Sequence, residues 1–173
     1  MRHRVATKSL IWWGICTSGW GLRLQEGHRG RLFYPGAMTG VDLVDETFIL
    51  VAPARIATVV ADPGRWRGWW PTLELTVFMD RGLQGIRWSI TGELAGSAEI
   101  WLEAHGDGVL LHYYLRGNPT VPGSSSQQRT LPDSARGRRE IDRLRKRLAI
   151  AWKRNVWSLK DEMEGDRRPG EPR

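Results

Sequence analysis

The sequence predicts an α+β fold in which a curved antiparallel sheet of about five strands wraps around one long C-terminal helix. The segment 137–165 is the longest without proline or an internal glycine, and its apolar residues recur at steps of three and four. Upstream, residues 73–117 divide into runs in which apolar and polar residues alternate. Because the apolar stripe of the helix needs a long apolar partner, we expect the helix to lie across this sheet.

Residues 1–37 show neither helical nor strand periodicity over any length, and we expect an unstructured leader there. Basic residues precede the apolar stretch LIWWGIC, as in a signal peptide, but the stretch is short and no A-x-A site follows it. Regular patterning begins abruptly after Met38. We therefore hypothesise that Met38 begins the natural protein, and an intact mass that includes residues 1–37 would contradict this.

The folded domain, expected over 41–164, begins with a strand and two short helices. Residues 43–52 are patterned as a strand. Pro53 then opens the short helix PARIATVVAD, because proline suits the first turn of a helix. An Asp-Pro-Gly sequence ends that helix, and a second helical turn, RWRGWWP, follows over 65–71.

Four antiparallel strands with clear alternation come next. Their expected ranges are 73–80, 85–94, 97–105 and 109–117. Turns are expected at Arg81-Gly82, at Ala95-Gly96 and at the Gly-Asp-Gly sequence 106–108. The stretch 118–136 is rich in proline, serine and glutamine and predicts a mobile loop, and residues 165–173 predict a disordered tail.

The long helix has two different faces. Asp133 or Ser134 can cap its start, and Gly165 can end it. Its apolar stripe consists of Ile141, Leu144, Leu148, Trp152, Val156, Leu159 and Met163. The opposite side, which we call the basic face, carries Arg139, Arg143, Lys146, Lys153 and Arg154, with Ile150 and Trp157 among them. The basic face is either a solvated surface or a contact surface for an anionic partner.

The net charge of +7 arises at the two ends of the 173-residue chain. Residues 1–37 carry six Arg or Lys against one Glu, and residues 138–154 carry eight against two acids, whereas residues 38–116 carry six against ten. This distribution argues against a nucleic-acid-binding surface that covers the whole domain. The single cysteine, Cys16, excludes an intramolecular disulfide and suits a reducing, cytoplasmic location. No apolar run approaches the length of a transmembrane helix.

The stretch DPGRWRGWWP, at 62–71, resembles a pattern of bacterial START-like proteins: an aspartate, then an aromatic residue, a proline and a tryptophan. Trp66 stands at the aromatic position and Trp69 at the tryptophan position, whereas Arg67 replaces the usual proline. Together with the order of elements over 41–164, the stretch resembles the START-like, or SRPBCC, superfamily of polyketide cyclase/dehydrase and lipid-transport-like proteins, which have the helix-grip fold. The resemblance implies six strands after the short helices, and this chain offers four.

The resemblance also implies a cavity between the sheet and the long helix. The ligand-binding candidates are inward-facing strand residues, aromatic residues near the cavity mouth and polar groups of the helix. They are Trp66, Trp69, Trp70, Trp88, Ile100, Tyr113, Arg145, Trp152 and Asn155. An apolar pocket with a few polar groups is typical of a small-molecule site, so we expect a small hydrophobic ligand such as a lipid, an isoprenoid or a polyketide-like ring. Taken singly, each candidate also suits an ordinary core, and Arg145 also suits a side chain that only reaches back to solvent.

Catalytic motifs are absent, since the sequence has no G-x-S-x-G, phosphate loop, G-x-G-x-x-G or H-E-x-x-H pattern. The four histidines do not pair at metal spacing, so we expect neither a metal nor a cofactor, and His112 should face outward. Cyclase or dehydrase activity is implied only by the resemblance, which leaves the question of an enzyme open.

The alternative function is a ribosome- or RNA-associated module, because some START-like bacterial proteins resemble ribosome-association toxins and the basic face would suit RNA. The same face also leaves transient contact with a membrane surface open. On the other side of the sheet, Phe78, Trp101 and Tyr114 suggest either a partner or dimer contact, or a surface covered by the leader or the loop. Monomer and homodimer both remain open.

Overall fold

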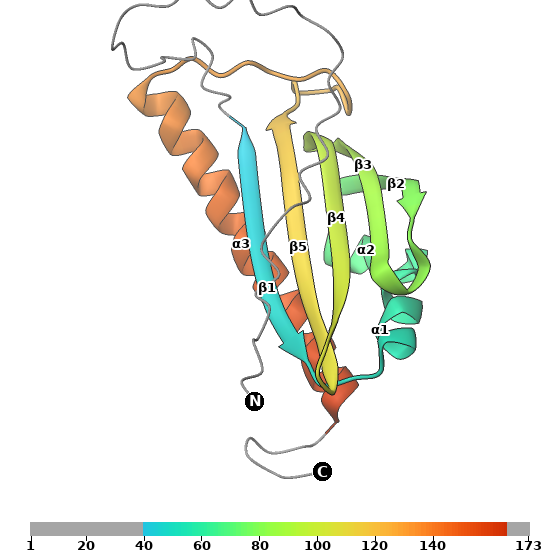
Figure 1. Cartoon of the computed structure of the whole chain (residues 1–173). Coiled ribbons are helices and arrows are strands. Elements are labelled where there is room, and N and C mark those ends of the chain that lie inside the picture. Colours follow the sequence, from blue (N-terminus) through green and yellow to red (C-terminus); the bar gives the residue numbers. More distant parts are fainter. Residues whose placement is uncertain (1–39, 166–173) are drawn as a thin grey trace, which may run out of the picture. The chain divides into compact units, whose positions relative to one another are not determined.

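Five antiparallel strands and one long helix dominate the structure, a computed structural model that describes residues 40–165 (Figure 1). The strands are β1 (Val41–Ile49), β2 (Leu73–Asp80), β3 (Gly85–Gly92), β4 (Leu94–His105) and β5 (Gly108–Pro119). The helices are α1 (Pro53–Val60), α2 (Pro63–Trp69), the short 3-10 helix η1 (Gly82–Gln84) and α3 (Ala135–Glu164). The predicted α+β class, the order of its elements and the five-stranded helix-grip arrangement are confirmed. The expectations for the leader 1–37 and for most of the tail 165–173 lie outside the described residues.

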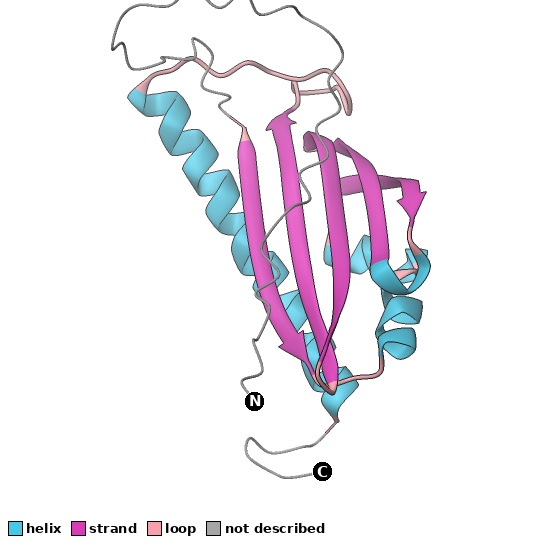
Figure 2. Cartoon of the chain, in the orientation of Figure 1, coloured by secondary structure: helices cyan, strands magenta, loops and turns pink. Residues whose placement is uncertain are grey.

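The strands form one sheet in the order β1-β5-β4-β3-β2, and every neighbouring pair is antiparallel. Strands β2 to β5 follow one another as a meander, whereas β1 lies at the far edge beside β5. Figure 2 shows the helices behind the sheet, so that one face of the sheet is covered by them. Helix α3 packs on β1, and buried residues of the three α-helices and all five strands form one hydrophobic core.

Helix α3 is held as the sequence predicts, by a cap at its start and an apolar stripe along its length. The Ser134 hydroxyl accepts a hydrogen bond from the Gly137 backbone N–H at 3.2 Å, and Gly165 follows the last turn. Six of the seven stripe residues are buried: Ile141, Leu148, Trp152, Val156, Leu159 and Met163. The seventh, Leu144, is half-buried. Burial of this stripe against the sheet stabilises a helix that is otherwise strongly charged.

The expected turn at Ala95-Gly96 is wrong. Strand β4 begins at Leu94, and the turn lies at Gly92, whose φ of +107° is open to glycine but rarely to other residues. Gly96 has a different role, because a Cβ there would come within 2.1 Å of the Arg116 carbonyl oxygen. Its missing side chain therefore lets β5 approach β4 closely.

Several other boundaries differ from the sequence expectation by a few residues. Strand β1 begins at Val41 rather than at residue 43 and ends at Ile49 rather than at residue 52. The loop 118–136 folds back on the sheet, since Thr120 pairs with Gln128 and the Gln128 side chain donates to the Ala95 carbonyl at 3.2 Å. The mobility of this loop stays a prediction. No helix within residues 40–165 is long and apolar enough to cross a membrane.

Candidate ligand-binding site

Five tryptophans and one tyrosine meet between the sheet and helices α2 and α3. This aromatic cluster consists of Trp66, Trp69, Trp70, Trp88, Tyr113 and Trp152. Trp152 of α3 stacks on Tyr113 of β5 with ring centroids 3.9 Å apart and lies parallel to Trp70 at 5.8 Å. Trp66 of α2 meets Trp88 of β3 edge to face at 5.3 Å. The structure thus brings together six of the nine predicted ligand-binding residues, with Ile100 fully buried in the same core.

Some indole N–H groups of this cluster donate a hydrogen bond, and one does not. Trp66 donates to the Val60 carbonyl at 2.8 Å and Trp152 donates to the Asp45 carboxylate at 3.0 Å. Trp70 donates to the Tyr113 hydroxyl oxygen at 3.1 Å. Trp88 is fully buried, and its N–H has no hydrogen-bond partner within residues 40–165. Buried donors are nearly always paired in native proteins, so an unpaired one marks a place where an acceptor is missing.

Tyr113 supplies a second donor in the same place. Burial raises the pKa of its phenol well above the ordinary value, so the hydroxyl stays protonated at every physiological pH. Its oxygen accepts from Trp70, but the structure gives its O–H no acceptor among the described residues. Both groups neighbour Trp70, whose ring centroid lies 5.7 Å from that of Trp88 and 5.9 Å from that of Tyr113. Within residues 40–165, the cluster therefore holds two donors without an acceptor, the Trp88 N–H and the Tyr113 O–H, both on residues that neighbour Trp70.

Two of the predicted ligand-binding residues, Trp69 and Asn155, line a separate groove between α2 and α3. The Asn155 amide donates to the Trp69 carbonyl at 2.9 Å, which ties the end of α2 to α3. The groove has a volume of about 310 Å³ and is bordered by the ion pair of Arg65 and Glu162. Asn155 thus has a structural partner already, and Trp69 belongs to both the groove and the aromatic cluster.

Arg145 lies apart from both of these places. Its side chain is half exposed and pairs with Asp142 at 3.3 Å on the same helix. This geometry does not bring Arg145 to the aromatic cluster, so its expected role in holding a ligand gains no support.

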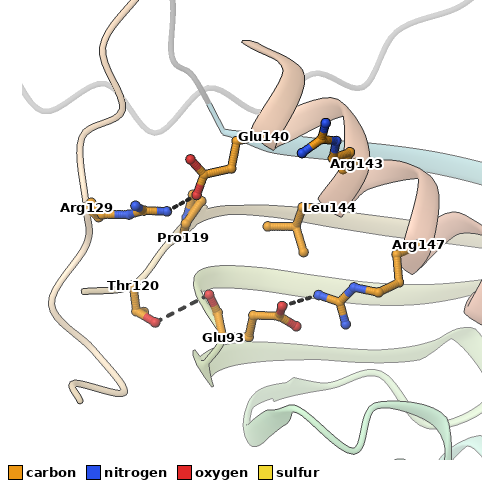
Figure 3. A pocket seen from close by; sticks show the side chains of 8 residues that line it. All are labelled: Glu93, Pro119, Thr120, Arg129, Glu140, Arg143, Leu144 and Arg147. Carbon is orange, nitrogen blue, oxygen red and sulfur yellow. Dashed lines mark hydrogen bonds and ion pairs between the residues drawn. The ribbon is translucent and has the colours of Figure 1, made fainter. Parts of the chain in front are cut away.

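A larger pocket lies between the first turns of α3, the loop after β5 and the turn between β3 and β4 (Figure 3). Its volume is about 390 Å³. We call it the α3 pocket, and it is lined by Glu93, Pro119, Thr120, Arg129, Glu140, Arg143, Leu144 and Arg147. Arg147 pairs with Glu93 and Arg129 pairs with Glu140 across it. Five of the eight lining residues are charged and none is aromatic, which differs from the apolar, aromatic lining expected from the sequence.

Most residues of the α3 pocket were missed by sequence reasoning. Arg143 was assigned to the basic face and Leu144 to the apolar stripe, and the others were assigned no role. A signal was nevertheless present, because Glu140, Arg143, Leu144 and Arg147 recur at the helical spacing of one shared face. The residues that the loop and the strand ends contribute carry no such signal.

The rest of the basic face is exposed, and the structure pairs one of its cations. Lys153 lies 2.5 Å from the Asp45 carboxylate, whereas Ile150 and Trp157 are exposed large apolar residues. Nothing in this arrangement singles out RNA, so the alternative function stays a prediction.

The outer face of the sheet holds a second aromatic group. His112 faces outward as predicted but is buried there, stacked on Trp101 at 4.4 Å, with its two ring nitrogens each 3.1 Å from a carboxylate, of Glu46 and of Glu103. Phe78 is exposed. Within the described residues, no group of three His, Cys, Asp or Glu side chains could hold a metal ion.

No family model matches this sequence, and no curated protein matches it significantly. Among solved structures, the chain is similar to the Aha1 dimer from Colwellia psychrerythraea, with a TM-score of 0.46 and 13% identity, over 72% of this chain and 96% of that one. An AHSA1-like protein from Rhizobium etli gives a TM-score of 0.44 and 15% identity, over 78% of this chain and 90% of that one.

The di-domain ARO/CYC StfQ from the steffimycin biosynthetic pathway gives a TM-score of 0.40 and 13% identity, over 71% of this chain and 52% of StfQ. The chain's own topology is that of the helix-grip fold. The expected resemblance therefore holds at the level of the fold, and the site must be argued from the residues of this chain.

Proposed function

We propose that this protein binds a small hydrophobic ligand between the sheet and helix α3. The observation that carries the proposal is the indole N–H of Trp88, which is buried and unpaired in a cluster where three other tryptophans are paired. Leaving such a donor without an acceptor costs about 1–3 kcal/mol. A ligand oxygen at this position would remove that cost.

The surroundings of Trp88 define the chemistry of the ligand. Aromatic rings and aliphatic side chains such as Ile100 favour an apolar, preferably planar body. The N–H of Trp88 and the O–H of Tyr113 favour at least one oxygen acceptor, such as a carbonyl or an ether. Lipids, isoprenoids and polyketide-like rings that carry such an oxygen all meet both requirements. The proposal is one of binding, since neither donor is a base at neutral pH.

Binding requires side chains to move, because the aromatic rings contact one another in the unliganded structure. Leu144 offers a route. It lines the α3 pocket and also packs against the hydrophobic core. A ligand that enters the pocket and displaces Leu144 would reach the core without crossing the sheet.

Two probes of nearly the same shape test the proposal. We expect 2-acetylnaphthalene, which carries a carbonyl oxygen, to bind about tenfold more tightly than 2-ethylnaphthalene, because only the former can accept from Trp88. Affinities are measured by titration of tryptophan fluorescence. The difference should shrink in Trp88→Phe, which leaves only the Tyr113 hydroxyl as a donor, and should persist in full in the control Trp101→Phe, which alters the outer face of the sheet. If neither probe binds up to its solubility limit, the aromatic cluster is a closed core and the proposal fails.

A further inference from the structure

We propose that the α3 pocket recognises the carboxylate of an amphipathic organic acid through Arg143. This inference rests on the proposed function and specifies the ligand further, by adding a charged end that binds in the neighbouring α3 pocket. It assigns the charged end of the ligand to the α3 pocket and the apolar body to the side of Leu144 that faces the core. Some charges of the pocket already have partners within the protein, and others are left for a ligand.

Both carboxylates of the pocket are occupied. One oxygen of Glu93 pairs with Arg147, and its other oxygen accepts from the Thr72 hydroxyl at 2.9 Å. Glu140 pairs with Arg129 across the pocket. Figure 3 shows the two ion pairs on opposite sides of Leu144. These contacts leave little capacity for a cationic ligand.

Two donors of the pocket are not occupied. Arg143 lines the pocket and has no carboxylate partner among the residues that the structure describes. The Nε–H of Arg129 is buried and has no acceptor there either. Three arginines face two glutamates, so the lining carries one net positive charge. A single carboxylate would balance this charge, and a guanidinium binds a carboxylate with two parallel hydrogen bonds.

The apolar part of the pocket sets the direction of the ligand. Arg143 and Leu144 are consecutive on α3, and Pro119 adds a second apolar surface. A carboxylate held at Arg143 therefore leaves its apolar chain against Leu144, the side chain that also contacts the hydrophobic core. The pocket volume of about 390 Å³ lies in the range of small-molecule sites. An organic acid with a chain or ring system of moderate size fits these conditions.

The experiment compares decanoate with 1-decanol, which has the same chain without the charge, by isothermal titration below the micellar concentration. In the wild type, decanoate should bind at least about tenfold more tightly than decanol, because charge-assisted hydrogen bonds are the stronger kind. Arg143→Met should remove this preference. The control Lys146→Met, which removes an exposed cation of the same helix outside the pocket, should keep it.

A direct readout of the pocket comes from the Arg129 side chain. Its Nε–H resonance in a ¹H–¹⁵N spectrum should shift when decanoate is added to the wild type and should shift less in Arg143→Met. Equal affinity for decanoate and decanol, or an equal effect of both variants, would overturn this inference and leave the proposed function standing. If decanoate, decanol and the naphthalene probes all fail to bind, the proposed function itself is wrong.

Discussion

Gly85 begins β3 at a place where no side chain fits. Its φ is +104°, and a Cβ there would come within 2.0 Å of the Ile100 carbonyl oxygen on β4. Gly82, three residues earlier, also has a positive φ of +57°, but nothing lies within 4 Å of its would-be Cβ. A side chain at Gly82 would therefore meet only the cost of the backbone conformation, whereas a side chain at Gly85 would also meet a steric clash.

We predict that Gly85→Ala destabilises the protein by about 3 kcal/mol or more, because the backbone of β4 must shift to admit the methyl group. Gly82→Ala should cost only about 1–2 kcal/mol, the usual cost of a left-handed conformation for a residue with a side chain. Chemical denaturation of both variants measures the free energy of unfolding. Equal losses for the two variants would show that β3 and β4 are not as closely placed as the structure has them.

At the scale of elements, helix α3 is tied to the rest of the fold at its C-terminal half. The Glu164 carboxylate accepts from the Leu50 backbone N–H at 2.8 Å, just after β1. Glu162 accepts two hydrogen bonds from Arg65 of α2, at 2.6 and 2.7 Å. These contacts join residues that are about a hundred positions apart in sequence. They fix which part of α2 and β1 the helix lies against.

The Arg65–Glu162 pair predicts a pH dependence. Hydrogen bonds from the Arg65 guanidinium lower the pKa of Glu162 below its ordinary value. A carboxyl with a lowered pKa in the folded state stabilises the protein at neutral pH, and this contribution is lost as the pH falls through that pKa. Glu162→Gln should therefore cost about 0.5 kcal/mol at pH 7, since both side chains are partly exposed, and progressively less in acid.

The control for this prediction is Asp161→Asn. Asp161 is an exposed neighbouring carboxyl on α3 that has no ion pair within residues 40–165. Its substitution should change the unfolding free energy by much less at every pH. If the difference in unfolding free energy between wild type and Glu162→Gln stays constant from neutral to acidic pH, the contribution of the pair does not depend on the charge of Glu162.

Elements could be predicted from the sequence more reliably than the contacts between them. The stripe of α3 has a local period, so the helix was placed within two residues of its observed start. A glycine that makes a turn and a glycine that admits a neighbouring strand look the same in sequence, which explains the error at Gly96. The α3 pocket joins three separate segments, 93, 119–129 and 140–147, and only the last of them has a pattern of its own.

The aromatic residues of the site are predicted in three ways. Strand alternation selects Trp88 and Tyr113, and the apolar stripe of the long helix selects Trp152. The resemblance to START-like proteins selects the three tryptophans of the stretch 62–71. The same reasoning could not show that their rings contact one another, because side-chain packing depends on how closely the sheet and α3 approach. Trp88 and Tyr113 were selected as apolar and polar wall residues, and their unsatisfied donors became visible only with their neighbours in place.

For the whole molecule, the hydrophobic core connects every helix and every strand of the described domain except η1. We therefore predict a single cooperative unfolding transition. Tryptophan fluorescence reports on the aromatic cluster, and far-UV circular dichroism reports on the helices and the sheet. The two signals should give the same denaturant midpoint. Loss of helical signal before any change in fluorescence would show that α3 unfolds by itself and is not part of the same cooperative unit.

The position of β1 at the edge of the sheet has a consequence for how the chain folds. Strands β2, β3 and β4 can each pair with the next strand as soon as it is made. Within residues 40–165, β1 pairs only with β5, with Val41 opposite Gly117. In a nascent chain on the ribosome, β1 must therefore stay unpaired until β5 emerges. Helix α3, which packs on β1, is made later still. Such distant pairing slows folding and exposes apolar strand surface. During synthesis, β1 is thus the strand that waits longest for its pairing partner.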